Sequence, residues 1–408
     1  MDLLFHTLDN GIRLVHSPSG GMVAHCGLII NAGSRDENEN EHGIAHFIEH
    51  MLFKGTKKRK SYHILSRLED VGGELNAYTT KEDTAVHASF LRDDYERATE
   101  LIADITFNSI FPEKEIKKEK DVILDEINSY LDSPAELIFD EFEEQIFDGL
   151  PVGRSILGKP DSVRSFSRKM ISDFISEKYS TDQIVFCSVG NIPDEKILRL
   201  FINHFSHYKS GRKNPENNSD WHYEPSTVIK QKDTYQNHCI IGNLAYSIKD
   251  EKRLGMFLLN NILGGQGLNS RLNLSLREKN GIAYSVESNY TPYSDNGSFS
   301  IYFGTDKQYL EKSISIVNRE LKNLCETRLG TVQLGKAKKQ IKGYLARGYE
   351  NHENLMLSLG KSLLTFNRIE TIEETYSKIE AITSANLLEI ANEVFDRSKL
   401  STLIYKQG

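Results

Sequence analysis

The sequence contains an internal repeat, and this feature restricts the possible folds more than any other. The stretch FIEHMLFKG at Phe47–Gly55 aligns with FLLNNILGG at Phe257–Gly265, at a constant offset of 210 residues. An apolar, strand-like run precedes each copy (HCGLIINAG and HCIIGNLAY), and each half ends in a helical pattern followed by another apolar run (QIVFCSVG and LSTLIYKQG). Strand-then-helix patterns also occur in unrelated domains, but the agreement in order, spacing and closing elements favours duplication. We therefore expect two domains of the same fold.

A change in composition marks the boundary between these domains. Residues Tyr208–Pro225 read YKSGRKNPENNSDWHYEP, a stretch rich in Gly, Pro, Asn and Ser and nearly devoid of aliphatic side chains. We predict an N-terminal domain at 1–208, a linker at 209–225 and a C-terminal domain at 226–408. Within the first domain, strand composition (23–32, 84–91, 183–189) is mixed with helical periodicity (43–54, 61–71, 93–107, 113–131, 167–178). The expected fold is α+β, with two homologous domains of an α/β-roll type whose sheets are antiparallel, joined by the linker into a clamshell.

The overall composition argues against several classes of protein. The chain has 50 Lys and Arg against 58 Asp and Glu, a net charge of −8, whereas a dedicated nucleic-acid-binding protein is usually basic. The cysteines are far apart and none belongs to a CxxC pair, which is typical of thiols in a reducing compartment. No apolar run approaches the ~18 residues that a membrane span needs, and the first residues lack the basic start of a signal peptide. We expect a cytoplasmic protein that binds neither nucleic acid nor membranes.

A short motif at residues 46–50, HFIEH, carries the clearest chemical signal. His46 and His50 are spaced i and i+4, so both imidazoles lie on one face of a helix and can reach one metal ion. Glu49 lies beside that face, where it can contact a metal-bound water without being a ligand. A polar helix with two incidental histidines is the alternative. H-x-x-E-H is nevertheless a known catalytic pattern, the inverse of the zincin motif.

A catalytic zinc ion needs a third protein ligand, and the segment 113–131 offers two candidates. Glu119 and Glu126 are seven residues apart and therefore share a helix face, flanked by isoleucines that would turn that face inward. Carboxylates beside a buried apolar seam are costly unless they are paired or bound to a metal. The segment is rich in acids, however, so an acidic surface helix remains the alternative.

The motif and its surroundings resemble a known family. Ala32–Arg35 (AGSR) and the run from His42 to Thr56 (HGIAHFIEHMLFKGT) closely resemble the M16 metallopeptidases, also called the pitrilysin or inverzincin family. The chain is similar to the half-length subfamily that includes the mitochondrial processing peptidase and its bacterial relatives. The resemblance implies that His46, His50 and a glutamate about 76 residues downstream bind Zn²⁺. Glu126, 76 residues after His50, has that spacing. Glu49 would be the general base, and Glu119 would support the site.

The resemblance extends over most of the chain. Gly73–Thr79 (GELNAYT) looks like the family's edge strand, where Asn76 and Ala77 would hold the backbone of a peptide substrate. Ile156–Gly158 (ILG) resembles a further segment that is characteristic of the family. In the second half, Arg277 and Tyr284 have the spacing of the Arg and Tyr with which the family contacts substrate near the scissile bond.

Two departures from the family pattern matter, and the duplication adds a separate point. Gln266 interrupts the family's glycine-rich stretch, which also has one extra residue here, and Asn273 stands where an aromatic residue is usual; both leave the peptide preference open. At the repeat offset, the zinc motif corresponds to Met256, Leu259 and Asn260, so we expect no zinc site in the second domain.

Together these features predict a zinc-dependent endopeptidase that hydrolyses short unfolded peptides in an enclosed chamber. The main alternative is a non-catalytic or partner-dependent subunit of an M16-type heterodimer, and a zinc enzyme acting on a small molecule is a third reading. Because one chain contains both the zinc set and the Arg277/Tyr284 pair, a homodimer is expected rather than an obligate heterodimer.

Overall fold

Two compact units make up the chain. The computed structural model describes residues 2–211 and 221–408. The first unit consists of Met1–Asn128, Arg154–Ser219 and Arg347–Thr371, and the second of Ser129–Gly153, Asp220–Ala346 and Ile372–Gly408. Much of the predicted linker at 209–225 lies outside the described residues.

The first unit is built on a six-stranded sheet with the order β1-β2-β6-β3-β5-β4. Its strands are β1 (Leu4–Thr7), β2 (Arg13–Pro18), β3 (Val23–Ile30), β4 (Glu74–Thr79), β5 (Thr84–Leu91) and β6 (Ile184–Gly190). Strand side chains alternate between the two faces, so neighbours such as Leu28 and Ile29 belong to different hydrophobic clusters. Both faces of this sheet are therefore apolar, and other elements must pack on each face to shield it from water.

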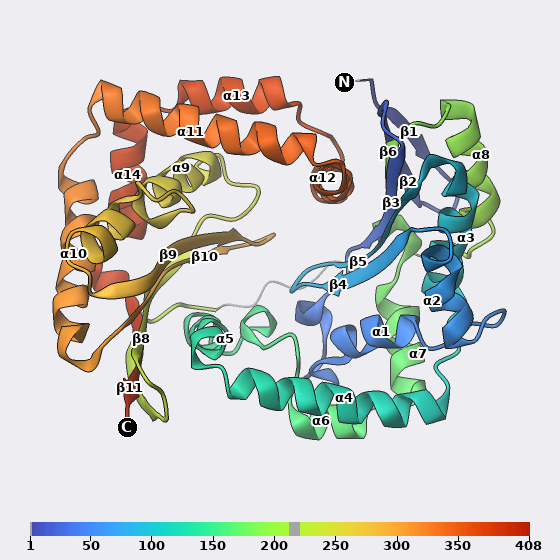
Figure 1. Cartoon of the computed structure of the whole chain (residues 1–408), viewed down its shortest axis with the longest axis horizontal. Helices are drawn as coiled ribbons and strands as arrows, with labels where there is room; N and C mark the ends of the chain where they lie inside the picture. The colour runs from blue at the N-terminus through green and yellow to red at the C-terminus, as the bar shows by residue number, and fades with distance from the viewer. Residues whose placement is uncertain (1, 212–220) are drawn as a thin grey trace. The chain divides into compact units, whose positions relative to one another are not determined.

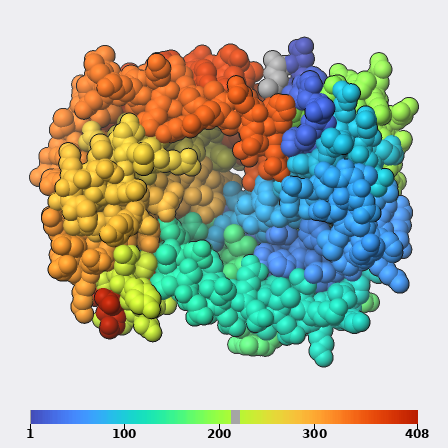
Figure 2. All heavy atoms as spheres, in the orientation of Figure 1, coloured from blue at the N-terminus to red at the C-terminus, as the bar shows by residue number. Residues whose placement is uncertain are grey.

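Helices supply that cover on each face. The face that carries Leu28 belongs to the largest hydrophobic core. Seven helices from the first half of the sequence contribute side chains to this core: α1 (Ile44–Leu52), α2 (Ser61–Glu69), α3 (Tyr95–Phe107), α4 (Glu113–Leu131), α6 (Pro160–Ser165), α7 (Arg168–Lys178) and α8 (Asp194–Phe205). On the face that carries Ile29, α12 (His352–Phe366) packs against β3 and β6 (Figure 1). The orange-red atoms of α12 lie directly against blue atoms of the N-terminal strands (Figure 2).

The second unit contains a five-stranded sheet with the order β7-β11-β8-β10-β9. Its strands are β7 (Thr227–Lys232), β8 (Asn237–Ala245), β9 (Ala283–Pro292), β10 (Gly297–Thr305) and β11 (Ser401–Gln407). Its helices are α5 (Pro134–Ile146), α9 (Arg253–Gly264), α10 (Leu310–Glu326), α11 (Thr331–Glu350), α13 (Ile372–Ala381) and α14 (Ser384–Val394), the last residues of α11 belonging to the first unit. Among the described residues, no helix is both long enough and apolar enough to cross a membrane.

The predicted duplication is visible element by element. With α2 left aside, the order β3-α1-β4-β5-α3-α4-α5 recurs as β8-α9-β9-β10-α10-α11-α12; between α9 and β9 the second half has a short π-helix (Asn273–Glu278) where the first half has α2. The two sheets share one strand order apart from the additional β1. One pair of equivalent helices is exchanged: α5 packs on β8 and β11 in the second unit, and α12 packs on β3 and β6 in the first. Each sheet is thus covered on one face by a helix from the other half of the sequence.

The α+β fold with two related domains agrees with the prediction, but the sheets are mixed and not purely antiparallel. β2 runs parallel to β6, and β7 runs parallel to β11. In each half the last strand returns beside an early one (β6 beside β2, β11 beside β7) after a long series of strands and helices, and such a crossover is the connection that parallel neighbours require.

Candidate metal centre in the first unit

Helix α1, which carries the H-x-x-E-H motif, begins at a tightly packed glycine pair. Gly43 has φ +89°, and a Cβ at this position would lie 2.6 Å from the carbonyl oxygen of Leu157. Gly158, with φ +78°, packs reciprocally against His42 and Gly43. Only glycine combines positive φ with so close an approach of two backbones. The segment Ile156–Gly158 therefore fixes the start of α1 by packing against Gly43.

A buried carboxylate holds the same end of the helix. Glu37 accepts hydrogen bonds from the backbone N–H groups of Gly43 (2.9 Å, to Oε2) and Ala45 (2.9 Å, to Oε1), and only 3% of the residue is exposed. Burial raises the pKa of Glu37 to about 8, although the two N–H groups act in the opposite direction. A carboxylate at a helix N-terminus satisfies backbone donors that the helix itself leaves unpaired. Glu37 therefore helps to set the position of the motif.

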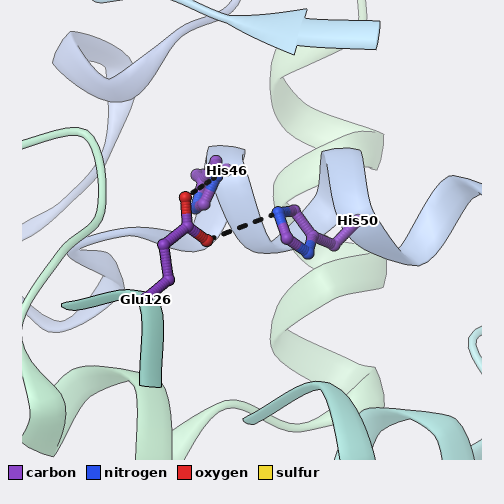
Figure 3. Close-up of side chains that lie close together, drawn as sticks. All are labelled: His46, His50 and Glu126. Atoms are coloured by element: carbon purple, nitrogen blue, oxygen red, sulfur yellow. Dashed lines mark ion pairs between the residues drawn. The ribbon is translucent and has the colours of Figure 1, made fainter. Parts of the chain in front are cut away.

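The structure brings His46, His50 and Glu126 together. One ligand atom from each lies within 4.8 Å of the others. His46 Nε2 is 3.9 Å from Glu126 Oε1, and His50 Nε2 is 3.8 Å from Glu126 Oε2 (Figure 3). The apolar residues of α1, among them Phe47 and Met51, are fully buried in the core, and the two histidines lie one turn apart beside α4. The predicted helix face thus exists, and Glu126 of α4 lies next to it.

These three side chains fit a zinc ion. Metal–ligand bonds of 2.0–2.2 Å in tetrahedral geometry place ligand atoms roughly 3.3–3.6 Å apart, slightly less than the separations here. Burial and the neighbouring His50 lower the pKa of His46 to about 4, so His46 is neutral at pH 7 and offers a lone pair. Two imidazoles and one carboxylate are a donor set of catalytic zinc, which keeps a further position for water.

Behind this cluster lies a second contact layer. Glu119 is 4% exposed, and its Oε1 lies 2.9 Å from His50 Nδ1 while its Oε2 lies 2.7 Å from Lys54 Nζ. Burial alone would raise the pKa of Glu119, but His50 and Lys54 lower it below the ordinary value, so the group is a carboxylate. When this carboxylate accepts the Nδ1–H of a neutral His50, the Nε2 lone pair, on the side of Glu126, is available to a metal ion. Glu119 thus lies outside the three-residue cluster and contacts one member of it.

Glu49 belongs to α1 but not to the cluster. It is partly buried, and burial raises its pKa, whereas its contact with Thr79 at the end of β4 acts in the opposite direction. A carboxylate adjacent to the histidines but free of the ligand set is available to accept a proton.

The strand beside Glu49 is the edge of the sheet. Among the strands that the structure describes, β4 pairs only with β5, through contacts that include Asn76 opposite His87 and Ala77 opposite Val86. An edge strand of this kind presents backbone groups to which an extended peptide can bind.

The remaining predicted residues lie in the second unit. Arg277 belongs to a short π-helix at Asn273–Glu278, where its Nε is 3.9 Å from Glu278 Oε1. Tyr284, near the start of β9, is 79% exposed. Their contact with a substrate stays a prediction. At the positions that correspond to the zinc motif, α9 has the buried apolar Met256 and Leu259, and the described part of this unit contains no cluster of potential metal ligands.

One of the two related domains thus carries a motif helix with two histidines and, beside it, a glutamate from a second helix. Residues 14–160 match the family model Insulinase (Peptidase family M16), and residues 165–341 match the Peptidase M16 inactive domain. The chain belongs to peptidase family M16.

Relatives of the same length support this assignment. The chain is 31% identical to a Bacillus subtilis protein named uncharacterized zinc protease YmxG (99% of this chain, 98% of the relative). It is 34% identical to an uncharacterized zinc protease of Rickettsia bellii (97% and 96%). Among solved structures, a Helicobacter pylori protease superposes with a TM-score of 0.90 at 22% identity (99% of each chain). A peptidase M16 inactive domain from Pseudomonas fluorescens superposes with a TM-score of 0.93 at 18% identity (100% of this chain and 99% of that one). These two structures share the fold.

Sequence reasoning missed two residues that contact the site. Glu37 precedes α1 by seven residues, and no capping rule connects an acid at that distance with the start of a helix. Lys54 was not singled out from the sequence, although its spacing of four from His50 is a signal that could have been used.

Proposed function

We propose that this chain is a zinc-dependent endopeptidase. The observation that carries the proposal is the cluster of His46, His50 and Glu126, outside which Glu119 contacts His50. His46, His50 and Glu126 would hold the ion, which when bound lowers the pKa of a water molecule and polarises the scissile carbonyl. The N-terminal domain (1–208) is the zinc-binding domain in this proposal, and 226–408 is a substrate-binding domain without zinc ligands.

The chain's own residues supply the rest of the chemistry. Glu49 takes the proton of the attacking water and passes it to the leaving amine, since it lies next to His50 in sequence and is not occupied as a ligand. The unpaired edge of β4, with Asn76 and Ala77, binds an extended peptide as an additional strand. Arg277 and Tyr284 hold the substrate and stabilise the developing negative charge.

The proposal has three further parts. The substrates are short unfolded peptides in an enclosed chamber, because an added strand requires an extended backbone. The protein is a cytoplasmic homodimer with two equivalent sites. The competing reading, a non-catalytic or partner-dependent subunit, is disfavoured because Glu49 and all three ligand residues are present together.

Two substitutions separate metal binding from catalysis. Glu49→Gln should keep roughly one zinc ion per chain, because the three ligands remain, and lose ~10²-fold or more in cleavage of a mixed peptide library. His46→Ala should lose the zinc ion as well, since two ligands hold it poorly. Elemental analysis of the purified proteins measures the metal, and mass spectrometry of the peptides measures cleavage.

Two results would contradict the proposal. If Glu49→Gln protein bound no zinc, the division of roles between base and ligand would be wrong. If the zinc-loaded unsubstituted protein cleaved no peptide in the library, the reading as a non-catalytic subunit would replace this one.

A further inference from the structure

Lys54 lies just beyond the end of α1, outside the metal cluster. Its backbone N–H donates to the carbonyl oxygen of Met51 (3.1 Å), and the following residues are held by isolated bridges that join Gly55 to Lys60 and Thr56 to Ser109. The chain is therefore fixed on both sides of Lys54. Its side chain is 27% exposed and extends to Glu119 of α4. The backbone thus fixes where the flexible side chain starts, and the ion pair with Glu119 holds its ammonium group.

The partner of Lys54 is a carboxylate that has little contact with water. The Glu119 side chain is 5% exposed, and each of its oxygens has one partner: Oε1 meets His50 Nδ1 at 2.9 Å, and Oε2 meets Lys54 Nζ at 2.7 Å. A buried carboxylate is costly unless it is paired and hydrogen-bonded. The ammonium group of Lys54 both compensates the charge of Glu119 and fixes the rotation of its carboxylate plane.

We propose that Lys54 is a positioning residue of the metal site, which acts through Glu119 on His50; this inference rests on the proposed zinc site. Lys54 holds one oxygen of Glu119, so the other oxygen stays in line with the Nδ1–H of His50. That hydrogen bond fixes the tautomer and the ring orientation of His50 and directs Nε2 to the metal. The order of contact is Lys54, Glu119, His50 and then the ion.

The sign of the effect separates positioning from simple electrostatics. A cation near a zinc ion repels it, so a purely electrostatic Lys54 would weaken metal binding, and its removal would tighten binding. A positioning Lys54 has the opposite effect, because its removal frees Glu119 and hence the His50 ring. The direction in which zinc affinity changes therefore decides between the two.

Zinc affinity of the full chain, measured by competition with a chromophoric chelator, provides the test. Lys54→Met should weaken zinc binding by ~10-fold or more, the lower end of what loss of an outer contact costs. Lys54→Arg should restore most of the affinity because a guanidinium keeps the charge and the donors. Lys118→Met is the matched control: Lys118 lies on α4 next to Glu119 in sequence, but its side chain is 59% exposed and pairs with Glu115, so affinity should not change.

A double-mutant cycle tests the route through Glu119. In a Glu119→Gln background, Lys54→Met should cause little further loss, because the contact through which Lys54 acts is already gone. The absorption spectrum of the Co²⁺-substituted protein should change alike in Lys54→Met and Glu119→Gln, since both release the same imidazole. If Lys54→Met fails to fold, Lys54→Gln takes its place in every measurement.

The outcomes are distinct. Unchanged or tighter zinc binding in Lys54→Met, or full additivity with Glu119→Gln, overturns this inference and leaves the proposed function intact. Failure of the unsubstituted chain to bind zinc overturns the proposed function and this inference together.

Discussion

The substitution Gly360→Ala tests whether α12, the exchanged helix, is closely packed against the first sheet. Gly360 is a buried residue in the interior of α12. A Cβ added to it would lie 2.7 Å from Ile29 Cγ1 and 2.8 Å from Cys187 Sγ, on β3 and β6. Real Cβ atoms do not approach other atoms so closely, so Gly360→Ala forces the helix away from the sheet.

The expected magnitude follows from two opposing terms. Overpacking a close-packed contact costs ~1–3 kcal/mol, while alanine in a helix interior gains ~0.5–1 kcal/mol over glycine. The net change in the free energy of unfolding is therefore a loss of ~1 kcal/mol. For a unit of roughly 200 residues, that loss lowers the melting temperature by ~2–4 °C.

Gly348→Ala is the control for helix propensity. Gly348 lies in the part of α11 that belongs to the first unit, and no atom lies within 4 Å of its added Cβ. This substitution should raise the melting temperature by ~1–3 °C, because only the propensity gain applies. Calorimetry measures both variants. Zinc affinity should stay unchanged in each, since α12 and α1 contribute to different hydrophobic clusters. A melting temperature for Gly360→Ala equal to or above that of Gly348→Ala would refute the reasoning.

Two other predictions concern the ligand set and the exchanged helices. Glu126→Gln should abolish tight zinc binding, while Glu119→Gln should cost only ~10–100-fold as an outer contact; equal losses in titrations of the two variants would reverse the assignment. The separately expressed halves 1–208 and 226–408 should each leave one apolar sheet face uncovered and bind a hydrophobic dye, and mixing them should remove the signal. Stable, dye-free halves would show that neither sheet needs the helix from the other half.

Features that depend on local periodicity and on the repeat could be predicted from sequence. The i, i+4 spacing of His46 and His50 defines one helix face whatever the rest of the chain does, and α4 was predicted at its observed bounds, Glu113–Leu131. The repeat offset indicated two domains of one fold and an apolar counterpart of the zinc motif in α9. In these cases the information that predicts the structure lies within one segment of the sequence or in the alignment of two segments.

Features that depend on tertiary placement could not be predicted in this way. Amphipathic periodicity identifies the apolar face of α12 but not the sheet that this face covers, so the exchange with α5 was missed. The parallel pairing of β2 with β6 was missed because a strand pattern does not encode the direction of its neighbour. Lys54 and Glu119 are 65 residues apart, and no local rule pairs them.

The two copies of the motif helix show what a metal site requires of this fold. In α9 the positions that correspond to His46 and Glu49 hold Met256 and Leu259, which are buried in an apolar core. In α1 the corresponding His46 is only 8% exposed, and its Nδ1 has no hydrogen-bond partner in the described part of the chain. Burial of such a polar group costs free energy, which metal coordination by the other ring nitrogen would offset. The duplicated fold therefore accepts apolar residues at two of these positions and Asn260 at the third, whereas the polar set in α1 is what the proposed metal ion would require.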